Sequence, residues 1–160
     1  MEFLTQMQEV WSFYSVGEAD TVNLGRALAQ ISVKGDIYAL FGTLGMGKSV
    51  LSRAFVQYFQ GEVEVPSPTF TLLQTYETPD FDIYHFDLYR LKSPEEIFEL
   101  GMEEAMYEGV CLIEWPEKMG AYLPKRAITV KITPEGSGRR FAFFAEGAAA
   151  ERLLSLKDKL

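Results

Sequence analysis

The chain has 160 residues, of which 48% are hydrophobic, and it carries a formal net charge of −8. This length and composition predict a single domain over residues 1–160 with a sizeable core, and they exclude a disordered chain. The acidic balance argues against binding of nucleic acid by this chain alone, because such binding requires a basic surface, although a partner could supply the basic groove in a nucleic-acid pathway.

A short edge strand and an amphipathic helix are the first elements expected. The strand is placed over residues 11–14, where alternation of apolar and polar side chains is weak. Ser15 and Glu18 have the spacing of a capping box, which predicts a helix that runs to about Gln30. Most of its buried side is expected to come from apolar residues at helical spacing: Val22, Leu24, Ala27, Leu28 and Ile31.

A strand, a glycine-rich loop and a helix follow. Residues 37–41 form an apolar run that predicts a buried strand. Residues 42–49 read Gly-Thr-Leu-Gly-Met-Gly-Lys-Ser and fit the pattern G-x-x-x-x-G-K-[ST]. Residues 50–59 have the apolar spacing of a helix. The loop pattern therefore lies in the strand–loop–helix context that it requires.

This loop pattern is typical of phosphate binding. Glycines allow backbone N–H groups to turn toward phosphate oxygens, and the start of the following helix adds a positive dipole. Lys48 can reach the outer phosphates, and the Ser49 hydroxyl can ligate Mg²⁺. The alternative is a glycine-rich turn that only caps the helix, but the flanking strand and helix favour the phosphate-binding loop.

The middle of the chain predicts two paired strands. Gly61 ends the helix, and the prolines in residues 66–68 force a non-helical connection. Residues 69–76 and 81–86 have the composition of strands. Because the turn between them is too short for a parallel crossover, we expect them to pair antiparallel, which makes the sheet mixed.

The last third of the chain predicts helices, a buried strand and a hairpin. Ser93, Pro94 and Glu96 form a helix start, and short helices are expected up to residue 100 and over residues 102–107. A continuous apolar run, typical of a buried parallel strand, follows at residues 110–113. The closing elements expected are a hairpin of residues 127–132 and 139–145 and a helix over residues 148–158. The whole pattern predicts an α/β fold with a mixed parallel and antiparallel sheet flanked by helices.

Two acidic residues directly follow predicted strands. Asp87 follows the apolar residues of the second paired strand, and Glu114 follows residues 110–113. Ligands of open α/β sheets bind at the carboxyl ends of the strands, so either acid could hold Mg²⁺ through water or polarise an attacking water. The alternative for both is a solvated carboxylate at a strand exit.

Several other side chains have two open roles. Thr69 could complete the Mg²⁺ shell as part of a switch loop, or it could be an ordinary strand threonine. His85 could support Asp87 or be a satisfied strand histidine, and one histidine with one cysteine makes a zinc site unexpected. Arg90 could neutralise phosphate charge or form a surface salt bridge. Three aromatic residues could contact the nucleotide or pack in the core: Phe13, Tyr14 and Trp115.

Further features bear on the nucleotide and the compartment. The only asparagine is Asn23, so the Asn-Lys-x-Asp element that reads guanine is missing, which favours ATP over GTP. The single cysteine, Cys111, excludes an internal disulfide and is compatible with a reducing cytosol. The first ten residues do not resemble a signal peptide, and no apolar run approaches the roughly 18 residues that span a bilayer. We therefore expect a cytoplasmic protein.

Taken together, the motifs resemble those of the TsaE family, small bacterial ATPases of tRNA threonylcarbamoyladenosine biosynthesis. The resemblance covers roughly residues 15–125 and includes the glycine-rich loop. The other matching segments are Thr-x-x-Leu-Gly at Thr21, Leu24 and Gly25, Ser-Pro-Thr-Phe at residues 67–70 with the following Tyr76, His-Phe-Asp-Leu-Tyr-Arg at residues 85–90, and Ile-Glu-Trp-Pro at residues 113–116.

The resemblance implies a P-loop NTPase fold, ATP and Mg²⁺ as cofactors, and an ATPase that is weak without its partners. It also implies a complex with two protein subunits, the carbamoyl-transferring subunit and its non-catalytic homologue, so that tRNA is met only indirectly. Lys48, Asp87 and Glu114 are then expected to act in catalysis, and Ser49, Glu114 and Asp87 to hold the metal. Expected nucleotide contacts are Gly42, Thr43, Leu44, Gly45, Met46, Gly47, Lys48, Ser49, Val50, Thr69 and Trp115.

The loop departs from the family pattern at three positions. The family more often has an acidic residue in place of Thr43, Ala or Ser in place of Met46, and Thr in place of Ser49. Ser49 is chemically equivalent to threonine as a ligand of Mg²⁺.

Two other classes of function compete with an ATPase that drives a tRNA-modifying assembly. One is a nucleotide-gated binding module whose hydrolysis is incidental. The other is a small-molecule kinase, which would need a lid with several arginines near the donor phosphates. The only adjacent basic pairs flank the predicted terminal hairpin, at residues 125–126 and 139–140, which disfavours the kinase.

Overall fold

The computed structural model describes residues 8–43, 47–69 and 71–160. The strands are β1 (Glu9–Ser15), β2 (Ile37–Phe41), β3 (Leu73–Glu77), β4 (Asp82–Asp87), β5 (Gly109–Glu114), β6 (Ile128–Glu135) and β7 (Gly138–Phe144). The α-helices are α2 (Glu18–Ile31), α3 (Lys48–Gln60), α4 (Met102–Glu108) and α5 (Gly147–Leu154). Short 3₁₀ helices are η1 (Pro94–Phe98), η2 (Pro116–Tyr122) and η3 (Ser155–Asp158).

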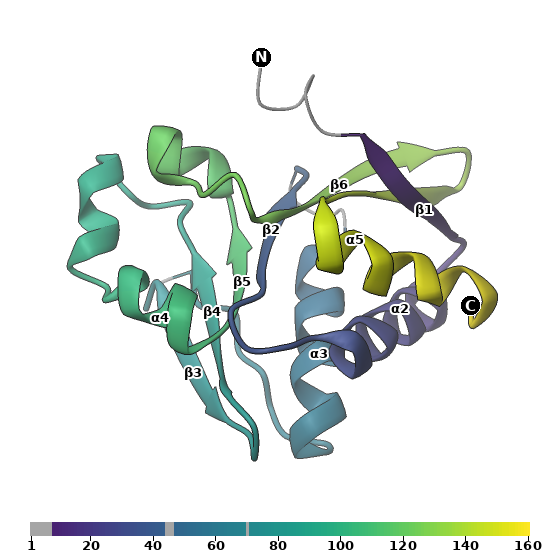
Figure 1. The fold of residues 1–160 in the computed structure, drawn as a ribbon, viewed down its shortest axis with the longest axis horizontal. Coiled ribbons are helices and arrows are strands. Elements are labelled where there is room, and N and C mark those ends of the chain that lie inside the picture. The colour runs from purple at the N-terminus through teal and green to yellow at the C-terminus, as the bar shows by residue number, and fades with distance from the viewer. Residues whose placement is uncertain (1–7, 44–46, 70) are drawn as a thin grey trace.

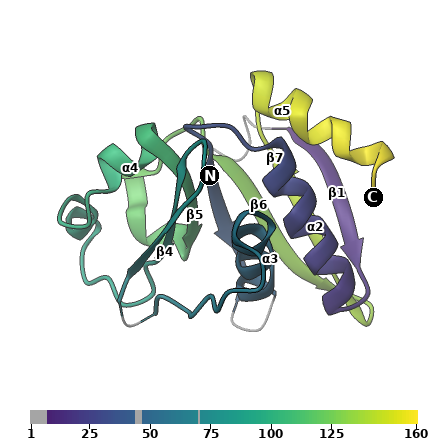
Figure 2. The same ribbon diagram turned by 90° about the horizontal axis from the view of Figure 1, so that it is seen from below.

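The strands form one seven-stranded sheet in the order β1-β7-β6-β2-β5-β4-β3 (Figures 1 and 2). Its centre is parallel, since β2 pairs parallel with both β5 and β6, and β4 pairs parallel with β5. Both sides are antiparallel, through β3 with β4 and through β6, β7 and β1. The predicted mixed sheet is therefore confirmed, including the antiparallel pair β3–β4 and the terminal hairpin.

The two faces of the sheet carry separate apolar cores. Along β2 the side chains alternate, so that Tyr38 and Leu40 face one core and Ile37 faces the other. The first core also contains side chains of α2 and α3, and the second contains side chains of η1, α4 and η2. Helix α5 lies alongside β1 and α2 (Figure 1). Within the described residues, no helix combines the length and the apolar character of a transmembrane segment.

Helices α2 and α3 approach each other closely at Gly25. A Cβ atom built at this glycine would lie 2.8 Å from both the Leu51 carbonyl oxygen and the Ala54 Cβ. Only a residue without a side chain fits this contact. Because α3 begins at Lys48, the Gly25 contact also sets where the end of the glycine-rich loop lies against the first turn of α2.

Two local predictions are wrong. The Ser15–Glu18 capping box does not form, because Gly17 is the N-cap of α2 and the Ser15 hydroxyl donates to the Gly17 carbonyl, 2.8 Å away. The strand predicted from Thr69 begins only at Leu73, because a turn precedes it in which Leu72 N–H donates to the Pro68 carbonyl. At Ser15 the side-chain hydroxyl bonds a nearby backbone carbonyl and does not cap the helix, a local competition typical of serine.

Candidate functional site

The glycine-rich loop leaves β2 and enters α3. Leu44, Gly45 and Met46 lie outside the described residues. Gly47, the N-cap of α3, has a φ of 93°, a left-handed conformation that favours glycine. Lys48 is the first residue of the helix, and Leu51 N–H donates to the Gly47 carbonyl, 3.0 Å away. The helix N-terminus therefore begins directly at the end of the loop.

Lys48 is turned inward rather than into solvent. Its Nζ donates to the Gly42 carbonyl oxygen at 2.6 Å and lies 4.2 Å from the centroid of the Trp115 ring. Burial lowers the pKa of its ammonium group, and the carboxylates of Glu114, Glu117 and Asp87 oppose that shift. The lysine is thus a buried cation held by its own loop and by nearby negative charge.

The two acids that follow strands are neighbours. Asp87 ends β4 and Glu114 ends β5, and the two are register partners across the parallel strands. Glu114 is also level with Leu40 of β2, one residue before the end of that strand. Both acids are buried. The parallel strands therefore bring both carboxylates to the carboxyl edge of the sheet, next to the start of the loop.

Asp87 has partners from two loops. The Thr69 hydroxyl donates to its Oδ2 at 2.8 Å, and the Tyr89 N–H donates to its Oδ1 at 3.0 Å. The Ser67 and Thr69 hydroxyl oxygens are 2.7 Å apart, so Ser67, which lies between two prolines, is linked to Asp87 through Thr69. Phe70, the last residue of the Ser-Pro-Thr-Phe match, lies outside the described residues.

Of the two roles left open for His85, support of Asp87 is not the one observed. Its Nε2 lies 2.6 Å from Glu114 Oε2 instead. Trp115 has a φ of 59°, which is uncommon for a residue with a side chain. Its ring contacts Lys48 and also the ring of Tyr89, whose centroid is 5.0 Å away. Strained residues of this kind concentrate at functional sites.

A cavity of about 360 Å³ opens at the end of the loop. Ser49 is exposed there, and Lys48 and Glu114 also line it. Its other lining residues are Glu18, Thr21, Gly47, Val50 and Arg139. Sequence reasoning missed Glu18, Thr21 and Arg139 as residues of the site. No local signal identifies Arg139, because it reaches the loop only through the position of β7 in the sheet.

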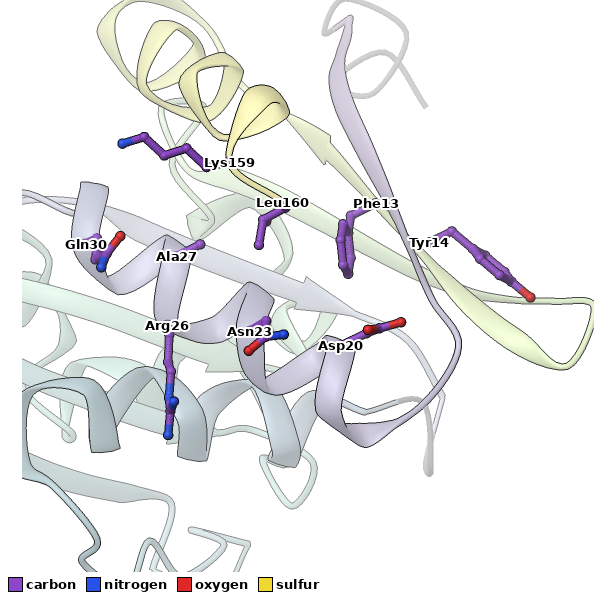
Figure 3. A pocket seen from close by; sticks show the side chains of 9 residues that line it. All are labelled: Phe13, Tyr14, Asp20, Asn23, Arg26, Ala27, Gln30, Lys159 and Leu160. Carbon is purple, nitrogen blue, oxygen red and sulfur yellow. The ribbon is translucent and has the colours of Figure 1, made fainter.

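A larger cavity, of about 530 Å³, lies elsewhere, between β1, α2 and the last residues of the described chain (Figure 3). Phe13 and Tyr14 line this cavity and not the one at the loop. In Figure 3 the Phe13 ring faces Leu160, whereas Tyr14 is directed away. Its hydroxyl donates to the Glu135 carbonyl at 3.0 Å. The two aromatics that could have stacked on a base are therefore not part of the site at the loop.

The donors at the loop fit Mg²⁺ bound together with phosphate. Hard cations prefer oxygen ligands, and the Ser49 hydroxyl and the carboxylates of Glu114 and Asp87 are of this kind. Across residues 8–43, 47–69 and 71–160, no group of three or more acidic, histidine or cysteine side chains could hold a metal by itself. One or two carboxylates with substrate phosphates are the usual arrangement for Mg²⁺.

Comparison with known proteins settles the family. A family model described as "Threonylcarbamoyl adenosine biosynthesis protein TsaE" matches residues 15–141. The chain belongs to the TsaE family. It is 50% identical over 116 residues to the tRNA threonylcarbamoyladenosine biosynthesis protein TsaE of Rickettsia bellii, which covers 72% of this chain and 81% of the relative. The TsaE protein of Haemophilus influenzae is 34% identical over 161 residues, 97% of this chain and 98% of the relative.

A solved structure agrees with this assignment. The crystal structure of Bacillus subtilis YdiB has a TM-score of 0.74 and 26% sequence identity to this chain, and the match covers 95% of this chain and 97% of that one. The predicted α/β, P-loop NTPase fold with a mixed sheet is confirmed. As a member of the TsaE family, the chain takes part in tRNA threonylcarbamoyladenosine biosynthesis.

Proposed function

We propose that the chain binds ATP with Mg²⁺ at the loop between β2 and α3 and hydrolyses it to drive the threonylcarbamoyladenosine modification of tRNA. The observation that carries the proposal is the convergence of one buried lysine and two buried acids at one edge of the sheet. Lys48 begins α3, while Asp87 and Glu114 end the neighbouring strands β4 and β5. Phosphoryl transfer needs this combination of a cation for the phosphates, ligands for Mg²⁺ and an acid that orders water.

Each residue of the proposed site has a separate task in this reaction. Lys48 exchanges the Gly42 carbonyl for phosphate oxygens and balances their charge. Ser49 and Glu114 hold Mg²⁺, which supplies further neutralisation of the phosphate oxygens. Asp87, anchored through Thr69, orients the attacking water and accepts its proton. Trp115 excludes water from the lysine side of the site.

Family membership supports a role together with other proteins of the same pathway. We propose that the chain acts in a complex with two protein subunits, the carbamoyl-transferring subunit and its non-catalytic homologue, and does not itself read the modified base. The net charge of −8 supports this division, because a chain this acidic is poorly suited to holding tRNA alone. Completion of the site by a partner would make ATP hydrolysis weak in the isolated chain.

Single-residue variants test the division of tasks in the reconstituted complex. Asp87→Asn keeps an acceptor for the Thr69 hydroxyl but removes the charge, so kcat should fall by about 10²-fold or more while nucleotide affinity stays within about threefold. Glu114→Gln should raise the Mg²⁺ concentration needed for half-maximal hydrolysis by about tenfold or more. A large loss of affinity with near-normal kcat in Asp87→Asn would instead make that acid a ground-state binding residue.

A second experiment separates an ATPase from a nucleotide-gated binding module. The number of tRNA molecules modified by each complex is measured with ATP and with a non-hydrolysable ATP analogue. The proposal expects the analogue to support no more than about one round of modification per complex. Many rounds with the analogue would show that nucleotide binding is sufficient and hydrolysis incidental.

A further inference from the structure

His85, the only histidine of the chain, lies beside the two acids at the carboxyl edge of the sheet. It precedes Asp87 by two residues in β4, so both side chains leave the strand on the same face. In the parallel pairing with β5, His85 is level with Leu112 and Asp87 is level with Glu114. Glu114 therefore leaves the sheet on the same face as His85.

The histidine and the glutamate form a buried pair. His85 Nε2 and Glu114 Oε2 are 2.6 Å apart, and the two side chains are 2% and 6% exposed. As a carboxylate, Glu114 accepts hydrogen bonds, and we assign the hydrogen between the two atoms to Nε2. In surroundings of low dielectric such a bond is strong, which makes it an effective restraint on the carboxylate.

The other side of the imidazole ring has no comparable contact. Nδ1 is buried, and in the part of the chain that the structure describes it has no hydrogen-bond partner. A buried polar atom without a partner costs free energy that an apolar side chain in the same strand would avoid. Packing therefore does not explain a histidine at position 85, whereas its contact with Glu114 does.

We propose that His85 is a positioning residue for Glu114. By donating to Oε2, the imidazole directs Oε1 toward the cavity that Glu114 lines together with Lys48 and Ser49. This inference rests on the proposed function, in which Glu114 holds Mg²⁺. Groups that hydrogen-bond a metal ligand from behind fix its orientation, and their removal costs about 10–100-fold in metal affinity.

The hydrogen-bond direction can be measured without nucleotide or metal. Because the chain has one histidine, a long-range ¹⁵N–¹H NMR spectrum of the labelled protein near neutral pH contains one imidazole pattern. The proposal expects the Nε2 resonance of a protonated nitrogen. An Nε2 resonance of an unprotonated nitrogen would overturn it, since that atom could not donate to Glu114.

Two variants then measure the consequence for the cation. ADP affinity is determined by calorimetry with Mg²⁺ and with chelator, and the ratio of the two isolates the contribution of the cation. His85→Leu should lower that ratio about 10–100-fold, and affinity in chelator should change little. His85→Gln, whose amide nitrogen can also donate, should recover most of the ratio. An unchanged ratio in His85→Leu, or no recovery in His85→Gln, would contradict the proposal.

A control variant and a measurement on the wild-type protein distinguish failure of the inference about His85 from failure of the proposed function. Thr129 is a buried side chain of β6, on the other face of the sheet, and Thr129→Val should change thermal stability without changing the ratio. If wild-type ADP affinity is the same with Mg²⁺ and with chelator, Glu114 does not hold a cation, and that part of the proposed function is wrong. The NMR measurement still decides in that case whether His85 donates to Glu114.

Discussion

Replacing Gly25 by alanine tests whether the α2–α3 contact sets the geometry of the loop. An alanine Cβ would lie 2.8 Å from the Leu51 carbonyl oxygen and from the Ala54 Cβ. Neither atom is the movable end of a flexible side chain, so the helices themselves must separate. Since α3 starts at Lys48, and Thr21 of α2 lies near Gly47, this separation should also disturb the nucleotide site.

The loss of stability expected for Gly25→Ala follows from two opposing effects. Overpacking of a close contact costs about 1–3 kcal/mol, and the rigid neighbours favour the upper part of that range. Alanine in place of glycine within a helix recovers about 1 kcal/mol through its higher helix propensity. The expected net loss is about 1–2 kcal/mol, which for a chain of this size lowers Tm by about 2–8 °C.

Thermal unfolding by circular dichroism and calorimetric titration with Mg·ADP are the assays. Asn23→Ala is the matched control, because it introduces the same residue at an exposed position of α2 and should leave Tm unchanged or slightly raised. Gly25→Ala should lower both Tm and nucleotide affinity. A Tm equal to that of the control, with unchanged affinity, would refute the argument that this glycine is required for helix contact.

Two further predictions concern buried groups away from the loop. Burial raises the pKa of the Cys111 thiol to about 12. A thiol reagent should therefore label the native protein only as slowly as β5 opens, and should label the denatured protein rapidly. Prompt labelling of the native protein would contradict this prediction. Arg152 donates to both carboxylate oxygens of the buried Asp36, at 2.6 and 2.8 Å. Arg152→Met should cost about 2–3 kcal/mol in urea unfolding, less than a fully buried pair because a quarter of the arginine side chain is exposed. Arg53→Met, which breaks an exposed pair with Glu18, should cost at most about 1 kcal/mol, and equal losses in the two variants would disprove the reasoning.

The local elements around the loop could be predicted because their signals are contiguous. The apolar residues of β2, the glycines and the helical spacing of α3 occupy adjacent positions in the chain. Asp87 and Glu114 could be recognised as neighbours of the loop because each directly follows an apolar strand. Where a single segment holds the whole pattern, periodicity and residue type are sufficient.

The remaining features depend on contacts between distant segments. Nothing in β6 indicates that it pairs parallel with β2, and the position of Arg139 at the loop depends on that order of strands. The sequence leaves His85 open between a support for Asp87 and a satisfied strand histidine, because its partner, Glu114, is set by the register of β4 and β5. The β propensity of residues 69–76 predicts a strand from Thr69 and leaves a switch-loop role open, whereas β3 begins at Leu73 and the Thr69 hydroxyl donates to Asp87.

The most direct test of the central claim is calorimetric titration of Mg·ADP into the wild-type chain and into Lys48→Ala. If the loop between β2 and α3 grips the phosphates, the wild type should bind one nucleotide saturably. The variant should lose about 10³-fold in affinity, as expected when a charge contact of about 4 kcal/mol is removed from a partly shielded site. Equal binding by the two proteins would contradict the account, because the nucleotide would then lie somewhere other than at this loop.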